Sequence, residues 1–420
     1  MGSAAFCSCH QHPLTVTDNS FIDSQLQSNN TSLIRNLNEQ DLVFWKKRSD
    51  SMPASYTDAN RYAAMLARRF HLKGDIHDLH SADSIVHKIN SAYREQEAGP
   101  LRTLAVYAIQ QHKFAEAGQF VDKALALGSE RYSSELLNFD VAFDLGQYDL
   151  AKNILQRIRS ANEYGYYFRK ARFEHYAGNL ELSTTDMRKA ADLAGDHIGL
   201  KQAALSNLAD LYLHAADVEQ AATLYRQSLR LDAGDLHSLM ALGWIALAHD
   251  RQDSLAEKIF LHIRSYSQSP DVLLKLAQVA QFRGDSTREK AYAQEFENIV
   301  TNSVYGNMYN KYLIDLYTGI LQQPAKAVQL AEKELTNRRT AQTYSWYAWA
   351  LYSNHQHNEA LKIYDQFVSG KPLEGPELFY MGEMMKGMGK GYNATAFFKA
   401  AYQNRYDLGI NRIQTLEKDH

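Results

Sequence analysis

Most of the chain is a succession of short amphipathic segments separated by tight polar turns. Residues 206–235 show the pattern clearly, with apolar side chains three and four positions apart on both sides of the turn. That spacing places the apolar side chains on one face of a helix. Small residues lie where two such helices would meet. The segment is therefore predicted to be a helical hairpin.

The hairpin pattern repeats along the chain with a period of about 34 residues. A small residue marks each first helix, and a second one follows about a dozen residues later in the next helix. Glycine and alanine at these positions let two helices approach closely. Phe139 and Asp315 stand where the other repeats have a small residue, so their hairpins are predicted to be distorted. The clearest small positions are Ala209, Ala221, Gly243, Ala348, Ala360, Gly382 and Ala394.

These positions resemble the motif of the tetratricopeptide repeat (TPR) family, W-x₂-L-G-x₂-Y…A-x₃-F…P. The matching groups are Leu208-Ala209-Tyr212 with Ala221-Tyr225, Leu242-Gly243 with Ala256-Phe260, Tyr347-Ala348-Leu351 with Ala360-Tyr364, and Met381-Gly382-Met385 with Ala394-Phe398. The resemblance implies an all-α, right-handed α-solenoid of about ten hairpins over residues 60–405. It also implies a concave face lined by the first helices.

The two ends of the chain differ from the repeats. Residues 1–40 are polar and are predicted to be a flexible leader. Residues 41–59 contain the apolar cluster Leu42-Val43-Phe44-Trp45 and are predicted to form an N-terminal capping helix over the first hairpin. Residues 406–420 place Ile410, Ile413 and Leu416 on one helical face, which predicts a C-terminal capping helix.

Aromatic residues are frequent at positions of the first helices that should face the concave side. Tyr and Trp provide large, rigid contact areas with a polar tip, so they are enriched in binding surfaces. We expect partner contacts from Trp244, Trp349 and Tyr352 first. Packing between repeats is the alternative role for each of these side chains. The remaining candidates are Phe143, Phe168, Tyr176, Phe282, Tyr309, Tyr312 and Phe379.

Composition limits the possible functions. The 420 residues carry a formal net charge of −3 without long runs of either sign, so a nucleic-acid partner is not expected. No stretch is apolar for the roughly 20 residues that a transmembrane helix needs. Metalloprotease, serine-hydrolase and dinucleotide-binding motifs are absent from the sequence, so we expect neither an enzyme nor a cofactor.

Three groups of residues have spacings that can bind metal. The pairs His77/His80 and His355/His357 fall in or beside predicted turns and have no cysteine nearby, so no metal ligands are assigned to them. The third group, Cys7-Ser8-Cys9-His10-Gln11-His12, offers two thiolates and two imidazoles.

The same N-terminal stretch has two other interpretations. It resembles the end of a bacterial lipoprotein signal peptide, with Cys9 as the lipid anchor, although Phe6 stands where leucine is usual and the hydrophobic region is missing. It can also be a leader without function. The first interpretation favours a secreted or membrane-tethered lipoprotein of the periplasm or outer membrane over a cytoplasmic protein.

Taken together, the sequence predicts a non-catalytic scaffold that binds a protein or peptide along the concave face. One alternative is a structural assembly subunit that uses its convex face or its termini. The other is a metal-handling protein that uses the N-terminal Cys/His cluster.

Overall fold

A computed structural model describes residues 15–30, 33–389 and 391–418 of the chain. These residues form helices and turns, with no β-strand among them. Helices α3 to α22 pair in chain order as ten hairpins, each helix packing mainly on its neighbours in sequence. The prediction of an all-α, TPR-like solenoid with about ten hairpins is confirmed.

The first helices of the hairpins are α3 (Tyr56–Lys73), α5 (Ala98–Gln110), α7 (Arg131–Asp144), α9 (Tyr164–Tyr176), α11 (Ile198–His214), α13 (Leu236–Ala248), α15 (Asp271–Phe282), α17 (Asn310–Thr318), α19 (Ala341–Ser353) and α21 (Gly375–Met388). The second helices are α4 (Ile76–Ala92), α6 (Phe114–Leu127), α8 (Tyr148–Arg157), α10 (Leu180–Leu193), α12 (Val218–Leu231), α14 (Asp253–Tyr266), α16 (Ser286–Val300), α18 (Pro324–Asn337), α20 (His357–Ile363) and α22 (Ala394–Gln403). A π-helical turn (Tyr364–Val368) continues α20, and 3₁₀ turns η1 (Ser303–Tyr305) and η3 (Arg405–Asp407) precede α17 and α23 (Ile410–Lys418). Two helices, α1 (Asn19–Asn30) and α2 (Leu33–Ser51), come before the hairpins.

Side-chain caps and small residues explain why the hairpins form where they do. Asp235 begins α13 by accepting hydrogen bonds from the backbone of His237 (3.2 Å) and Ser238 (3.4 Å). Gly243 leaves the space that the ring of Phe260 fills, since a Cβ there would lie 2.6 Å from that ring. Four of the marked alanines are fully buried, and Ala394 is half-buried; the buried four are Ala209, Ala221, Ala348 and Ala360.

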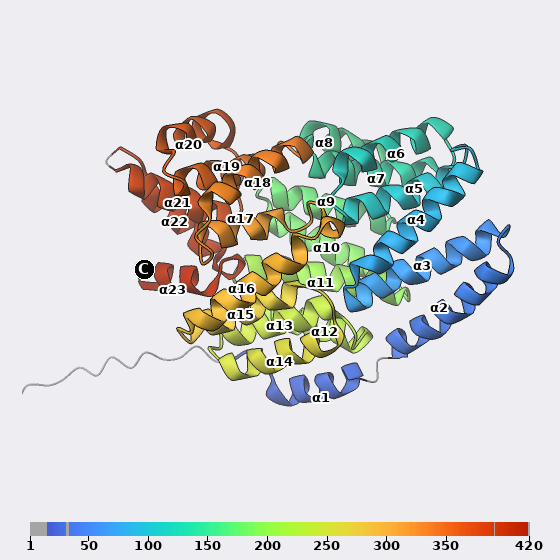
Figure 1. Cartoon of the computed structure of the whole chain (residues 1–420), viewed down its shortest axis with the longest axis horizontal. Coiled ribbons are helices and arrows are strands. Elements are labelled where there is room, and N and C mark those ends of the chain that lie inside the picture. Colours follow the sequence, from blue (N-terminus) through green and yellow to red (C-terminus); the bar gives the residue numbers. More distant parts are fainter. Residues whose placement is uncertain (1–14, 31–32, 390, 419–420) are drawn as a thin grey trace, which may run out of the picture.

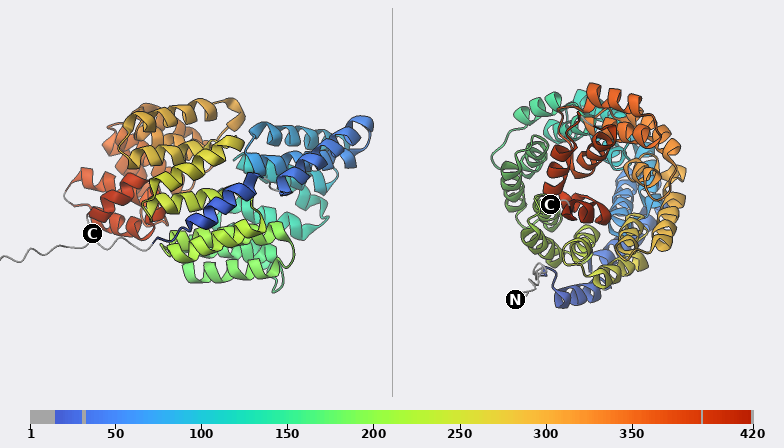
Figure 2. Two further views of the ribbon diagram at one scale, coloured as in Figure 1. Left: turned by 90° about the horizontal axis from the view of Figure 1, so that it is seen from below. Right: turned by 90° about the vertical axis from the view of Figure 1, so that its left-hand side faces the viewer.

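The solenoid winds into a superhelix that looks like a ring when viewed along its axis (Figures 1 and 2). Successive turns touch each other. The backbone N–H of Gln268 donates to the carbonyl of Lys73 at 2.6 Å, and His80 Nε2 lies 2.6 Å from the carbonyl of Val304. Gly74 permits the first of these contacts, because a Cβ at that position would lie 2.5 Å from the backbone of Ser269.

The expectation of an unstructured leader over residues 1–40 is wrong from residue 19 onward. Helix α1 packs on α14, with Ile22 and Leu26 buried, and α2 pairs with α3. Residues 1–40 are mostly polar, so the few apolar residues of these two helices were not recognised as the buried faces of helices. The expected cap over residues 41–59 also differs, because α2 ends at Ser51 and α3 begins at Tyr56. Of its apolar cluster only Leu42 is buried, whereas Val43 and Phe44 are 67% and 52% exposed.

The C-terminal helix has the predicted apolar face but does more than cap the last hairpin. Ile410, Ile413 and Leu416 are buried as α23 packs against α15 and α22. The end-on view in Figure 2 shows residues 404–418, hereafter the C-terminal segment, inside the ring. The segment therefore packs on the last hairpin and also occupies part of the concave space.

Candidate functional site

The concave space of the superhelix, here called the lumen, contains a large cavity. Its volume is about 1140 Å³. The first helices α11, α13, α15 and α17 supply about half of the lining, as a TPR-like arrangement implies. The C-terminal segment, α3, α21 and several loops between helices supply most of the rest. A second cavity of about 450 Å³ adjoins it, and Asp210, Lys311, Pro376 and Asp407 line both.

The C-terminal segment is held in the lumen by polar contacts from the wall. Gln278 Oε1 accepts a hydrogen bond from the backbone N–H of Ile410 at 2.6 Å, and thereby caps the first turn of α23. Trp244 donates its indole N–H to the carbonyl of Tyr406 at 2.8 Å. These contacts satisfy backbone groups that would otherwise be unpaired in the segment.

An arginine of the segment is bound by a carboxylate and an aromatic ring of the wall. The Arg412 guanidinium donates to Asp315, and the Tyr380 hydroxyl donates to the same carboxylate at 2.8 Å. The guanidinium carbon also lies 4.9 Å from the centre of the Tyr380 ring. Asp315 is the residue that replaces a small one in its repeat. Its departure from the motif thus gives the lumen an arginine-binding carboxylate.

Lys275 lines the lumen, and no carboxylate among the described residues forms an ion pair with it. Its Nζ lies 4.4 Å from the centre of the Trp244 ring, on a face of that indole. Burial lowers the pKa of Lys275 to about 8. Trp244 is therefore covered by both Lys275 and Tyr406, and it is only 4% exposed.

Four of the ten predicted contact residues line the cavities. Trp244, Tyr309 and Tyr312 face the larger one, and Phe168 faces the smaller one. Tyr309 donates its hydroxyl to Asp271 at 3.0 Å, whereas Tyr312 is 42% exposed. Tyr312 is therefore the predicted aromatic residue most available to a partner.

The other six predicted contacts pack against neighbouring side chains. Trp349 stacks on Tyr380 with ring centres 5.2 Å apart, and Tyr352 stacks between Trp349 and His357. The rings of Phe143 and Tyr176 lie against each other at 5.7 Å. Phe282 is half-buried against the main core and Phe379 is buried.

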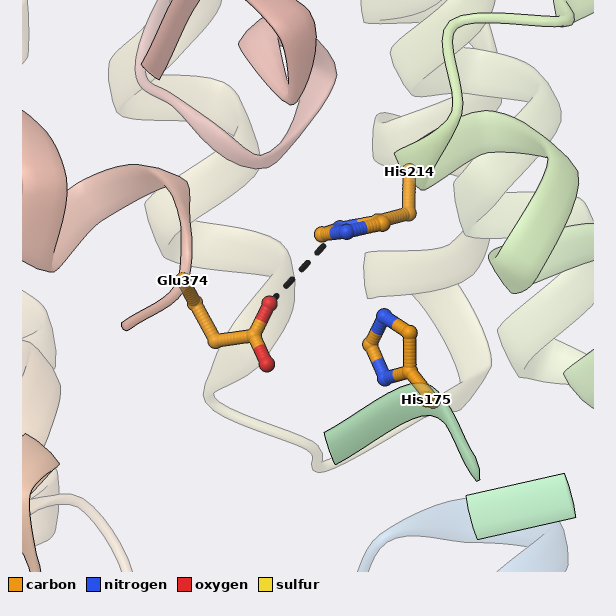
Figure 3. Close-up of side chains that lie close together, drawn as sticks. All are labelled: His175, His214 and Glu374. Carbon is orange, nitrogen blue, oxygen red and sulfur yellow. Dashed lines mark ion pairs between the residues drawn. The ribbon is translucent and has the colours of Figure 1, made fainter. Parts of the chain in front are cut away.

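The lumen also contains a cluster of metal-ligating side chains that the sequence did not reveal. His175 is the penultimate residue of α9, His214 is the last residue of α11, and Glu374 immediately precedes α21. One nitrogen of each imidazole and one oxygen of Glu374 lie within 4.8 Å of one another. Figure 3 shows the three side chains pointing toward a common centre.

Hydrogen bonds and burial set the charges of this cluster. Burial, with a smaller effect from His214, lowers the pKa of His175 to about 4, so its ring is neutral at neutral pH. Burial would also lower the pKa of His214, but the hydrogen bond and charge of Asp407 outweigh it and raise that pKa. Burial raises the pKa of Glu374.

The histidine pairs noted in the sequence have other surroundings. His80 contacts Val304, and the rings of His355 and His357 are 6.2 Å apart at the end of the stack on Tyr352. The Cys7–His12 cluster lies outside the described residues. Within the part of the chain that is described, no helix has both the length and the hydrophobicity to cross a bilayer.

The cavity residues that sequence reasoning missed are mainly polar and come from distant repeats. They include Lys275, His214, His175, Glu374, Asp407 and Arg412. The only sign of the site in the sequence was Asp315, which replaces a small residue of its repeat. The other cavity residues come together only because the superhelix closes.

Comparison with known proteins identifies the fold. No family profile matches the chain, and no curated protein is detectably related to it. Among known structures, the human IFIT1 dimer with m7Gppp-AAAA is similar at 11% identity, over 79% of this chain and 76% of that one, with a TM-score of 0.50. Yeast Tom70 is 11% identical over 96% of both chains, with a TM-score of 0.42, and a TPR protein from Parabacteroides merdae is 17% identical over 65% of this chain and 98% of its own, with a TM-score of 0.36. The chain has the α-solenoid fold of TPR proteins.

Proposed function

We propose that the protein is a non-catalytic scaffold whose lumen binds a segment of a protein partner. The observation that supports this proposal is the C-terminal segment itself. The concave wall already holds this peptide-like stretch through Gln278, Trp244 and Asp315, with backbone and side-chain contacts that a partner could also make. About 1140 Å³ of cavity remains beside it.

The charge of the lumen favours a basic partner. The lining of the larger cavity contains seven Asp or Glu residues but three Lys or Arg residues. Arg412 shows how a cation is bound there, since it pairs with Asp315 over the Tyr380 ring. We expect the partner to present arginine or lysine together with apolar side chains, and to bind less well as salt screens these charges.

The same charges disfavour a nucleic acid. The IFIT1 structure contains a capped oligonucleotide, but phosphate binding depends on clustered cations. In this lumen acidic residues predominate, and two of the three cations, Lys311 and Arg412, are paired with carboxylates.

A site-directed cross-linking experiment tests the proposal. A photoreactive phenylalanine at Tyr312 should capture a protein from an extract of the native source, and the same probe at Tyr392 is the matched control. The two tyrosines are similarly exposed, at 42% and 41%, but only Tyr312 lines the lumen. A partner captured at Tyr312 alone, and less at high salt, supports the proposal. Equal capture at both positions refutes it.

A second candidate function is assembly through the N-terminal end. Helix α2 and the residue that follows it expose four large apolar side chains, which is typical of a protein contact. They are Leu37, Val43, Phe44 and Met52, which are 45% to 67% exposed. Assembly through α2 replaces the lumen proposal if two results are obtained together. The Tyr312 probe captures no protein, and a protein that co-purifies with the unchanged chain no longer co-purifies with Val43→Ser/Phe44→Ser.

The lipid anchor also remains a proposal. Cys9 precedes the described residues, so its support is the sequence resemblance alone. Mass spectrometry of the protein isolated from its source would test it, because lipidation adds a defined mass to an N-terminal Cys9 peptide. An unmodified peptide that extends upstream of Cys9 would exclude it.

A further inference from the structure

We propose that His175, His214 and Glu374 bind one Zn²⁺ ion in the lumen. Two imidazoles and one glutamate carboxylate are a ligand set that zinc takes in proteins, with a water molecule in the fourth position of the tetrahedron. The ligands come from hairpins far apart in the sequence, which explains why their spacing gave no signal.

The geometry already brings the donor atoms near the distances that zinc requires. Donor atoms of a tetrahedral site with bonds of about 2.0–2.1 Å lie roughly 3.3 Å apart. Here the three donor atoms lie within 4.8 Å of one another, and His214 Nδ1 lies 3.7 Å from Glu374 Oε2. Small side-chain rotations would therefore close the site around an ion.

His175 has the properties of a metal ligand without a metal. Its imidazole is half-buried, and among the described residues no hydrogen bond is made to its ring. It packs edge-on against His214 with ring centres 4.5 Å apart. No described group therefore has to be displaced from this ring for a metal ion to bind it.

His214 is oriented by its neighbours in the way that ligand histidines usually are. Asp407 Oδ2 lies 2.6 Å from Nδ1, and the Asn404 side chain lies 2.8 Å from Nε2. An ion that binds the His214 imidazole would take the place of one of these two hydrogen bonds, and the other would keep the ring in position.

The ion would join parts of the protein that are otherwise held by weaker contacts. His175 and His214 belong to the wall formed by α9 and α11, whereas Glu374 immediately precedes α21 of the last hairpin. Zinc would therefore fasten the last hairpin to this wall. This inference concerns the protein alone and does not depend on the proposed partner.

Zinc titration of the full-length chain tests the inference. The chain should carry Cys7→Ser, Cys9→Ser, His10→Gln and His12→Gln, which removes the N-terminal cluster as a competing site. We expect one Zn²⁺ per chain by calorimetry, and a tetrahedral Co²⁺ absorption spectrum when cobalt replaces zinc. Both signals should be lost in His175→Gln and in Glu374→Gln.

The controls separate loss of ligands from loss of fold. Glu374 is 41% exposed, so Glu374→Gln should fold even if His175→Gln does not, and circular dichroism will show whether each variant keeps its helices. His355→Gln removes an exposed histidine outside the lumen and should bind zinc normally. No binding by the parent chain, or binding that persists in a folded Glu374→Gln variant with the same spectrum, would overturn the proposal.

Discussion

The contact between Gly243 and Phe260 gives the sharpest test of how the hairpins are packed. Gly243 lies in the middle of α13, and a Cβ added there would lie 2.6 Å and 3.0 Å from two atoms of the Phe260 ring and 3.2 Å from Ile259. Phe260 and Ile259 are both fully buried, so neither side chain has free space to move into. Gly243→Ala should therefore destabilise the protein, even though alanine is the better helix former.

The sign of the effect follows from two opposing magnitudes. Replacing glycine by alanine within a helix stabilises it by about 0.5–1 kcal/mol. Overpacking a filled core costs about 1–3 kcal/mol. The net change should be a loss of about 1–2 kcal/mol, because the clash involves a rigid ring instead of the end of a flexible side chain.

Gly118→Ala is the matched control, since the same change there should stabilise the protein. Gly118 also lies within a helix, α6, but its added Cβ would lie 3.5 Å from Val141, an ordinary contact distance. Urea denaturation followed by circular dichroism should show a lower midpoint for Gly243→Ala and a higher one for Gly118→Ala. Phe260→Leu in the Gly243→Ala background should recover part of the loss. Equal shifts for both alanine variants would refute the reasoning.

Three further predictions concern single contacts. Trp244→Phe removes the donor to the Tyr406 carbonyl, which should cost about 1–3 kcal/mol locally. Tryptic cleavage within the C-terminal segment should therefore increase by about 5- to 150-fold; unchanged cleavage contradicts this prediction. Asp250→Ala removes the acceptor for the backbone N–H groups of residues 16 and 17; hydrogen exchange should become faster in α1 by the equivalent of about 0.5–2 kcal/mol and stay unchanged in α13. Burial, assisted by the charge of Arg338, lowers the pKa of His112 from 6.5 to about 4. Between these two pH values the unfolded state binds more protons than the folded state. The free energy of unfolding should therefore fall as the pH falls through that range, by up to about 1.4 kcal/mol per pH unit. His112→Asn, which suits the positive φ of this position, should make the fall shallower; an identical pH profile would disprove this role.

The sequence was sufficient for the repeats because each hairpin is specified locally. Helices that are adjacent in the chain meet at small residues such as Ala209, Gly243 and Ala348. Such contacts recur with a fixed period and can therefore be recognised in the sequence. The ends lack this redundancy. Helix α1 has only three large apolar residues, Phe21, Ile22 and Leu26, and its partner α14 is more than two hundred residues away. Its polar composition therefore led to the wrong prediction.

The site was harder to predict because it depends on how much the superhelix curves. The position of Trp244 on a first helix predicts that it faces the lumen. It does face the lumen, but Tyr406 and Lys275 cover it. Asp315 departs from the repeat motif, and its role as the partner of Arg412 follows only from the return of the C-terminal segment into the ring. Neither fact is encoded in a local pattern.

The contacts between successive turns of the superhelix have a consequence for binding rates. Where Gln268 bonds to Lys73 and His80 meets Val304, the coils are joined side to side, so the wall is closed at these places to a chain approaching from outside. A long segment would then reach the lumen by threading from an open end, past a C-terminal segment that already lies there. Threading slows both entry and escape, so the bound state should be long-lived even when its affinity is moderate.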